Sequence, residues 1–482
     1  TSITRSIGSS YEGWSNMAYA TRLNYSYKGK YLFTASGRYD GASRLSAGNK
    51  WSFFPSAAVG WNIFEESFMK NIRQVNNLKL RASYGVSGNN RIVDFAFLDL
   101  LYGANYTYGG GTGVSSPGLV SSNSFLSNPN ITWERTGQRN FGVDLSMFKN
   151  RIGITLDIYK SKTDKLLLQQ SAMAFTGVPL FWNNIGSLEN KGYEFDISTT
   201  NVSNKNLKWT TSFNIAYNKN EVTSLAPGLT QIVSSTGGLE NPSITLPGYP
   251  IGMLFITRTA GVDPATGRRI FINNQGRQVF FQHVAPAGQA RFMYADGTTA
   301  PTVSSADAIV YKNTNAKIFG GWENNLRFKN FELNALFTYQ MGNWLYYGTQ
   351  AGLRDQRFWN NEVGVLNRWQ KAGDVTEFPR AVFGDNVSNG SSFPLDINVF
   401  KGDFIKLRTL TLGYNFPKNM LDKIKISNAR FYVSGNNLFI LTKYPGPDPE
   451  VSSNGNGTTN FGIDRNTVAN QRTITIGLNV GF

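Results

Sequence analysis

The sequence predicts an all-β protein whose strands form an antiparallel transmembrane β-barrel. Three features favour this fold class: apolar and polar residues alternate with a period of two, the alternating runs are long, and the links between them are short and long in turn. Successive residues of a strand point to opposite faces, so each alternating run indicates a strand with one apolar and one polar face.

The run 152–158 shows the alternation in its simplest form. Isoleucine or leucine occupies every second position, and Gly153, Thr155 and Asp157 lie between them. The apolar face could pack on a second sheet, as in a sandwich, or it could face lipid around a polar lumen. Many runs reach about 11 residues, as a membrane strand needs, whereas globular strands average about 5 to 6. Run length, link pattern and aromatic residues near strand ends therefore favour the membrane barrel.

The alternation defines thirteen strands. In chain order, the predicted strands cover residues 16–28, 30–43, 51–63, 77–88, 135–148, 151–168, 189–201, 206–220, 316–328, 331–342, 403–416, 428–440 and 471–482. The shorter links are Gly29, 64–76, 149–151, 202–205, 329–330 and 417–427. The alternate links, mostly long, are 44–50, 89–134, 169–188, 221–315, 343–402 and 441–470. Short links are typical of the periplasmic side of such a barrel and long links of the extracellular side.

Strand 316–328 illustrates the two expected faces. We expect lipid around three side chains on one face, Trp322, Leu326 and Phe328. We expect the barrel lumen at three side chains on the other face, Glu323, Asn325 and Arg327. Alternation next to the tight link 329–330 fixes this assignment.

The composition excludes several classes of protein. The chain has 482 residues, of which 14% are aromatic, and this argues against disorder. It has no Cys and a single His, His283, which excludes disulfides, thiolate metal sites and zinc sites built on several His. No apolar run approaches the roughly 18 residues of a transmembrane helix. We find no arrangement of catalytic residues, and we expect neither enzymatic activity, nor a metal, nor a cofactor.

The chain is basic, with 47 Lys and Arg against 31 Asp and Glu and a net charge of +16. Many of these cations lie at strand ends and in short links, among them Lys28, Lys149, Lys329 and Lys418. This placement suits lipid head groups and long side chains that reach the membrane interface. We therefore expect membrane lipids, and no nucleic acid, as partners.

Thirteen strands do not make a complete bacterial barrel, which normally has an even number. An open sheet would leave two bare edges in hydrocarbon, at a cost of several kcal/mol for each backbone group. We therefore expect 1–15 to be the remnant of an extracellular loop, and 16–482 to be the C-terminal part of a larger barrel. Residues 1–10 lack the apolar segment of a signal peptide, which alone would indicate the cytoplasm; we attribute this to a missing start.

Six segments carry a family resemblance, and they occur in the family's order. They are YLFTASGRYDGASRLSAGNKWSFFPSAAVGWNIFEE (31–66), LKLRASYGVSGNN (78–90), GGWENNLRFKNFELNALFTYQMGN (320–343), FIKLRTLTLGYNFP (404–417), FYVSGNNLFILTKYPGPDPE (431–450) and QRTITIGLNVGF (471–482). Together they resemble the C-terminal barrel of the SusC/RagA family of TonB-dependent outer-membrane transporters. No single segment would be sufficient, but six in order make the resemblance specific.

The resemblance implies a barrel of about 22 strands with a plugged lumen, of which this chain would supply about 13. It further implies a location in the cell outer membrane among its lipids, a SusD-like surface lipoprotein that caps the barrel, and import of oligosaccharides or oligopeptides. TonB would act through the missing N-terminal part, and the plug and remaining barrel segment would be partners of this chain. The alternative is a SusC-like barrel that acts as a structural anchor or docking platform without import.

Aromatic residues in the long links are weak candidates for substrate binding, because flat rings can stack on sugars or peptide side chains. These residues are Trp182, Trp344, Tyr346, Tyr347 and Trp359. The alternative is that the rings pack within the links, which need small cores of their own.

Two further patterns lie near the C-terminus. Asp448 and Glu450 could hold a cation, but Pro445, Pro447 and Pro449 favour a rigid turn. The last strand ends on an aromatic residue after strict alternation, which resembles the signal read by the outer-membrane assembly machinery. The residues of this signal would be Ile476, Leu478, Val480 and Phe482. The alternative is an ordinary final strand.

Overall fold

The computed structural model describes residue 11 and residues 13–98, 101–107, 115–121, 126–171, 180–236, 240–357, 360–454, 457 and 459–482. Strands dominate, and the few helices are short. Across these residues, no helix has both the length and the apolar character to cross a membrane.

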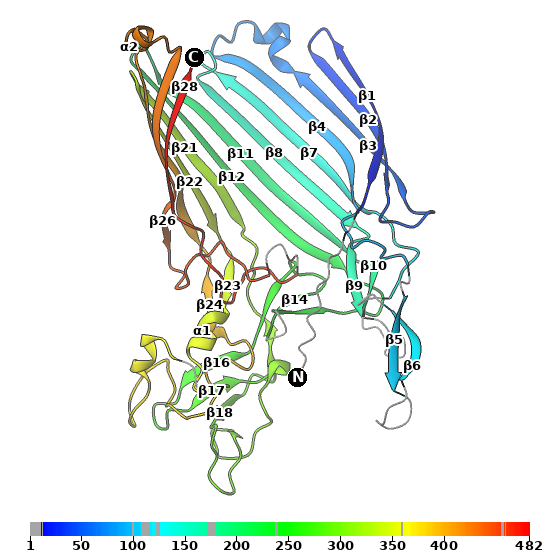
Figure 1. The fold of residues 1–482 in the computed structure, drawn as a ribbon, viewed down its shortest axis with the longest axis vertical. Helices are drawn as coiled ribbons and strands as arrows, with labels where there is room; N and C mark the ends of the chain where they lie inside the picture. Colours follow the sequence, from blue (N-terminus) through cyan, green and yellow to red (C-terminus); the bar gives the residue numbers. More distant parts are fainter. Residues whose placement is uncertain are drawn as a thin grey trace. The chain divides into compact units, whose positions relative to one another are not determined.

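Thirteen strands form one sheet whose hydrogen-bonded order follows the chain (Figure 1). They are β1 (Asn16–Tyr27), β2 (Tyr31–Ala42), β3 (Trp51–Asn62), β4 (Val75–Asn89), β7 (Glu134–Met147), β8 (Ile152–Asp164), β11 (Ser187–Ser203), β12 (Leu207–Ser224), β21 (Ile318–Phe328), β22 (Phe331–Met341), β25 (Phe404–Asn415), β26 (Asn428–Thr442) and β28 (Thr473–Gly481). All thirteen predicted strands are confirmed, and each predicted end lies within four residues of the observed one.

The ends of β8 and β12 differ most from the prediction, by four residues each. The alternation predicts that the strand beginning near residue 151 extends to residue 168, but β8 ends at Asp164. Lys165 has a φ of 58°, and this left-handed backbone interrupts the extended strand. The chain then begins a separate strand, β9 (Leu167–Ser171), which pairs with β10 (Leu180–Asn184).

One carboxylate ties the link between β3 and β4 to the neighbouring hairpin. Glu66 accepts hydrogen bonds from Lys30 Nζ (2.7 Å), the Tyr31 hydroxyl (2.9 Å) and the Trp61 indole (3.1 Å). These donors, Lys30 first, lower the pKa of Glu66 from 4.5 to about 2. The rings of Tyr31 and Trp61 stack with centroids 6.5 Å apart. A cation and two rings with polar tips thus gather at the short-link end, as expected of a membrane interface.

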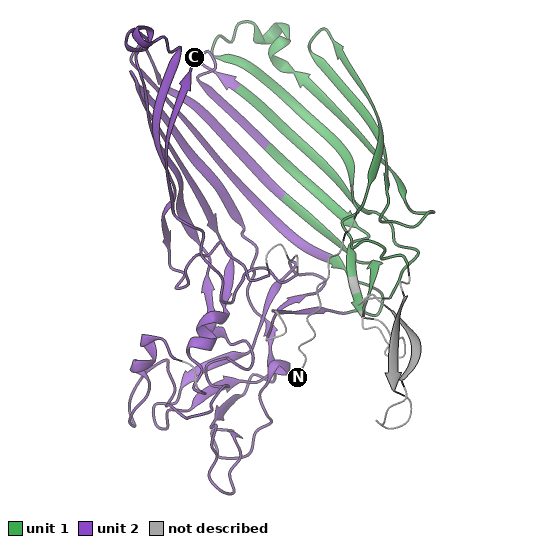
Figure 2. Ribbon diagram, in the orientation of Figure 1, with its two compact units in different colours: residues 1–145, 157–191, 223–229 green, residues 146–156, 192–222, 230–482 purple. Residues whose placement is uncertain are grey.

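The chain divides into two compact units (Figure 2). Unit 1 comprises residues 1–145, 157–191 and 223–229, and unit 2 comprises residues 146–156, 192–222 and 230–482. Unit 1 therefore holds β1 to β4 and most of β7 and β8. Unit 2 holds β21, β22, β25, β26, β28 and most of β11 and β12.

The long links of unit 1 have a small core of their own. Phe54 packs edge-on against Trp133, with ring centroids 5.4 Å apart, and the same buried cluster includes Leu45, Ile92 and Ile131. The link between β4 and β7 also forms a hairpin of β5 (Leu101–Thr107) and β6 (Ser115–Ser121).

The long links of unit 2 fold into three small sheets. The first contains β13 (Ile232–Thr236), β14 (Glu240–Thr245), β15 (Met253–Ile256) and β20 (Ile309–Val310). The second contains β16 (Arg258–Val262), β17 (Arg269–Ile272), β18 (Gln278–Phe281) and β19 (Phe292–Met293). The third contains β23 (Trp344–Tyr347), β24 (Val399–Lys401) and β27 (Ile463–Asp464). The six-residue α-helix α1 (Gly348–Leu353) follows β23 directly.

The large sheet has two edges, β1 and β28. The hydrogen-bonded order begins with β1 and ends with β28, and no ladder joins these two strands within the described ranges. Every residue of β1 and most residues of β28 are exposed. The outer backbone groups of both strands are thus available for further strands.

Candidate functional site on the polar sheet face and the long links

The two faces of the large sheet differ in chemistry, as β21 shows. Trp322 lies across from Phe213 on β12 and Phe337 on β22, and its ring stacks on that of Phe337 with centroids 5.5 Å apart. On the opposite face, Asn325 accepts a hydrogen bond of 2.7 Å from Asn334. The three residues that we expect to face lipid therefore share one face of β21. The three residues that we expect to face the lumen share the opposite face.

The polar face of unit 2 contains a hollow of about 340 Å³. Its charged lining residues are Lys208, Arg327, Glu332 and Arg430. Arg430 Nε lies 3.1 Å from a carboxylate oxygen of Glu332, so one cation is neutralised. The remaining cations give this part of the face a positive character.

The polar face of unit 1 is cross-linked by Arg81. Its guanidinium on β4 contacts Asp144 on β7 at 2.8 and 3.0 Å and Asp157 on β8 at 3.0 Å. Gly142 leaves room for these contacts, because a Cβ there would lie 2.5 Å from Asp157 and 2.6 Å from Arg81. One arginine thus joins three neighbouring strands on the side that we predicted to face the lumen.

The link 441–470 is fastened to the polar face of β25 by ion pairs. Lys406 Nζ lies 2.9 Å from Asp448 and 2.6 Å from Glu450, and Arg408 also pairs with Glu450. A β-bulge between Leu407 and Thr409 shifts the register of β25 at Arg408. The cation held by the two carboxylates is therefore a lysine of the protein. The described residues contain no group of three His, Cys, Asp or Glu side chains that could hold a metal.

A buried arginine organises the link 343–402. Arg269 on β17 is 1% exposed and donates to the carbonyls of Ser388 and Glu377, both at 2.8 Å, and to Asn389 Oδ1 at 3.2 Å. Burial lowers the pKa of Arg269 from 12.5 to about 10, so it remains charged at neutral pH. Beside it lies a cluster of fully buried apolar residues that includes Phe271, Val279 and Leu395. These links therefore have the interior of a small soluble domain.

Two of the five candidate substrate-binding aromatics lie in such cores or against them. Tyr346 is fully buried with Leu254 and Ile256, and burial raises the pKa of its hydroxyl. A fully buried ring has no free face for a substrate, so Tyr346 is a core residue in this structure. Trp182 packs against the core of unit 1.

Two other candidates are partly accessible. Trp344 lies under Lys312 and Lys401, whose Nζ atoms are 5.0 and 5.9 Å from its ring centroid. Tyr347 lies 5.5 Å from the ring of Tyr444 and is half-buried. Trp359 lies outside the described residues. Substrate stacking at Trp182, Trp344 and Tyr347 remains a prediction.

The residues of the predicted assembly signal lie on the edge strand β28, except Phe482, which directly follows it. Ile476, Leu478 and Phe482 are strongly exposed, Val480 is at the limit of exposure, and β28 pairs with β26 along its length. Their reading by an assembly machinery remains a prediction.

Sequence reasoning did not find the ion-pair cluster that holds the link 441–470. The available signal was Lys406 and Arg408, two cations within a strand that otherwise contains only apolar and uncharged polar residues. The partner carboxylates lie about 40 residues later, and no local pattern connects the two segments.

Comparisons with known proteins agree with one another. A sequence profile described as "TonB dependent receptor-like, beta-barrel" matches residues 3–252. TonB-dependent receptor P3 of Formosa agariphila is 32% identical over 468 residues, which is 96% of this chain and 45% of that protein. TonB-dependent receptor SusC of Bacteroides thetaiotaomicron is 31% identical over 97% of this chain and 44% of that protein.

A solved structure shows the same fold. The structure of the RagAB peptide transporter matches 97% of this chain and 48% of its own chain, with a TM-score of 0.80 and 25% identity. The chain thus spans slightly less than half the length of the curated relatives that it matches.

Proposed function

This chain belongs to the TonB-dependent receptor β-barrel family, a family of outer-membrane proteins rather than enzymes, and we propose that it is the C-terminal barrel part of a SusC-like importer. The importer takes up oligosaccharides or oligopeptides together with a SusD-like surface lipoprotein, and TonB supplies energy through the N-terminal part. The match to the RagAB peptide transporter over 97% of the chain is the observation that carries the proposal.

The sheet chemistry supports a solute pathway along one face. Arg81 with its two aspartates and Arg430 with Glu332 are charged groups that lipid would not tolerate at mid-depth, and both lie on polar faces. The opposite face carries exposed aromatic residues such as Trp322 and Phe331. This division suits a barrel that separates a wet lumen from lipid.

The edges of the sheet support a larger barrel. Unpaired backbone groups of β1 and β28 would each cost several kcal/mol in hydrocarbon. We therefore place 1–15 in an extracellular loop, and we place further strands of the full-length protein against β1 and β28, with a plug inside the barrel.

The lipoprotein partner has exposed apolar side chains to bind. Val363, Leu366 and Phe383 in the link 343–402 are 80%, 66% and 85% exposed. Exposed apolar side chains of this kind mark interaction surfaces when they occur together. Replacing all three by Ser in the full-length protein should reduce the lipoprotein that co-purifies with it. The matched control is Val468→Ser, which removes an equally exposed side chain (83%) from the link 441–470.

Uptake in living cells tests the importer directly. Cells with and without the full-length protein should differ in the peptides or oligosaccharides that they remove from a defined mixture, as measured by mass spectrometry of the medium. A protonophore should abolish the difference, because import through TonB requires energy. Equal uptake by cells with and without the protein, at normal levels of folded protein, would favour the anchor or docking platform instead.

A further inference from the structure

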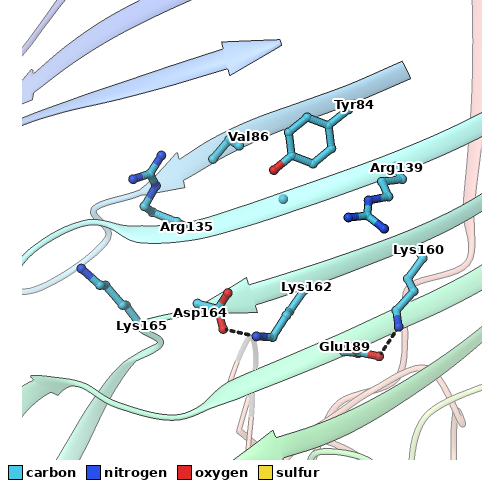
Figure 3. Close-up of a pocket in the computed structure, with 10 residues that line it drawn as sticks. Tyr84, Val86, Arg135, Arg139, Lys160, Lys162, Asp164, Lys165 and Glu189 are labelled. Atoms are coloured by element: carbon cyan, nitrogen blue, oxygen red, sulfur yellow. Dashed lines mark ion pairs between the residues drawn. The ribbon is translucent and has the colours of Figure 1, made fainter. Parts of the chain in front are cut away.

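Unit 1 contains a hollow of about 550 Å³ near the long-link ends of its strands (Figure 3). Tyr84 and Val86 of β4 lie along one side, and Lys160 and Lys162 of β8 along the other. Gly137 of β7 lies in the lining, so no side chain fills the space between them. A Cβ at Gly137 would lie 3.4 Å from the Tyr84 hydroxyl, which is an ordinary contact distance. The hollow is therefore open because residue 137 is a glycine, and not because a larger residue would clash there.

The lining is strongly cationic. Its five cations are Arg135, Arg139, Lys160, Lys162 and Lys165, and its two anions are Asp164 and Glu189, which leaves a net charge of +3. Lys160 pairs with Glu189 at 2.9 Å and Lys162 with Asp164 at 3.0 Å. Within the described ranges, no carboxylate pairs with Arg135, Arg139 or Lys165, and Arg135 donates to the carbonyl of Phe53 at 3.2 Å. Arg139 and Lys165 thus point to an anionic ligand that is not part of unit 1.

The hollow lies on the apolar face of the sheet. Arg139 and Phe141 share one face of β7, because they are two residues apart, whereas Asp144 lies on the opposite face with Arg81. Likewise Lys160 follows Ile158 on the same face of β8. The cations therefore begin where the apolar residues of these strands end, which is the level of the lipid head groups in a membrane barrel.

An apolar hollow continues the basic one toward the short-link end. It measures about 430 Å³ and is lined almost entirely by apolar side chains, among them Phe33, Val59, Leu80, Ala82 and Phe141. Leu80 and Ala82 precede Tyr84 and Val86 on the same face of β4, and Phe141 follows Arg139 on β7. A basic site thus adjoins an apolar furrow along one line of the sheet.

We propose that these two hollows bind a lipid with a phosphorylated head group. The phosphate occupies the basic hollow, where Arg139 and Lys165 neutralise it, and an acyl chain lies in the apolar hollow. Guanidinium and ammonium groups favour phosphate oxygens, and basic pockets at a membrane interface select anionic head groups. The adjoining furrow distinguishes this ligand from free phosphate, which has nothing to place there.

Titration of the full-length protein in detergent with diphosphorylated lipid A tests the proposal, with native mass spectrometry as the readout. Arg139→Gln combined with Lys165→Gln removes two cations without leaving a carboxylate unpaired, and it should weaken binding roughly 25-fold, at about fivefold per charge. Lys219→Gln is the matched control, because Lys219 is exposed near the long-link end of β12, pairs with Glu221 and does not line the hollow. It should bind within about twofold of wild type by the same measure.

Two further variants separate the parts of the site. Arg139→Lys with Lys165→Arg keeps both charges and should retain binding, which shows that charge and not folding is responsible. Ala82→Phe fills the apolar hollow and should weaken lipid binding without changing the charge. Lipid A stripped of its phosphates should bind no better than a zwitterionic lipid.

Several results would overturn the proposal. Equal binding by wild type and the double Gln variant would show that the basic hollow does not recognise the lipid. An equal loss in the charge-keeping variant would point to folding instead. Competition by millimolar inorganic phosphate, with no effect of Ala82→Phe, would identify free phosphate as the ligand and not a lipid.

Discussion

Apolar side chains are exposed on the large sheet but buried in the long links of unit 2. In the sheet, Phe328 and Phe331 are 49% and 61% exposed, as we expect of side chains that lipid covers in a membrane barrel. In the links, Phe271 and Leu395 are fully buried among protein atoms. The sheet is thus stabilised by its ladders and by the membrane, and the links are stabilised as a soluble domain would be. The same kind of substitution should therefore have different consequences in the two regions.

Truncation of a large side chain should show the widest difference. Phe271→Ala should destabilise the links by about 3 to 5 kcal/mol, because it leaves a cavity in a closed core. Phe328→Ala is the matched control on the sheet and should have a clearly smaller effect. Limited proteolysis of the folded protein measures both, and equal susceptibility of the two variants would contradict the comparison.

The ion pairs between the link 441–470 and β25 should join the two regions. Lys406→Met should destabilise this attachment by about 3 kcal/mol, at the lower end for a broken buried pair, since Arg408 still neutralises Glu450. Hydrogen exchange should then rise in residues 444–452 and remain unchanged in β1 to β4. Asn470→Ala is a suitable control, because it removes a hydrogen bond to Asp448 and no charge.

A charge on the apolar face of β21 should destabilise the protein by an amount that depends on how deep in the membrane it lies. Trp322→Arg should cost roughly 2 to 4 kcal/mol, whereas Leu326→Arg, nearer the tight link, should cost roughly 0 to 1 kcal/mol. Chemical unfolding in lipid vesicles measures the difference. Labelling of single cysteines by a water-soluble reagent checks the faces, and a reagent that reached position 322 but missed 323 would reverse the predicted orientation.

The C-terminal residue tests whether the apolar face is read during assembly. Deletion of Phe482 should lower the amount of folded protein in the outer membrane and leave ligand binding by the remaining molecules unchanged. Deletion should act more strongly than Phe482→Tyr, which keeps an aromatic ring. Normal outer-membrane levels after the deletion would leave an ordinary final strand as the better interpretation.

The smallest effect is expected at Glu66 in the short link. Its pKa in the folded protein, about 2, lies below the ordinary value of 4.5, so it stabilises the fold above pH 4.5 and this contribution is lost as the pH falls toward 2. The melting temperatures of wild type and Glu66→Gln should therefore differ at pH 6 and converge between pH 4.5 and 2. Glu65→Gln is the control, because it removes a neighbouring carboxyl without these three donors, and its melting temperature at pH 6 should match that of wild type.

The same comparison explains what could be predicted from the sequence. Strands such as β21 lie between two different media, so Trp322 and Glu323 alternate and reveal the strand. In β17 both faces are buried, and neither its run RIFI nor the run QVFF of β18 shows the alternation of apolar and polar residues that would distinguish a strand. The small sheets of the links were therefore missed.

The site residues were harder to predict for a related reason. Arg269 is positioned by carbonyl groups more than 100 residues away in the sequence. Lys406 is positioned by two carboxylates of the link 441–470. Contacts of this range leave no local pattern. The basic hollow did leave one, because Arg139 and Lys160 occupy apolar-face positions of alternating strands, but the sequence alone gives no reason to group them.

The arrangement of β1 and β28 in the full-length protein tests most directly whether this sheet is part of a larger membrane barrel. We predict that a structure of the full-length protein in a lipid nanodisc shows further strands paired with the outer edges of both β1 and β28. A ladder formed directly between β1 and β28, or a bare edge of either strand in contact with lipid, would contradict this assignment.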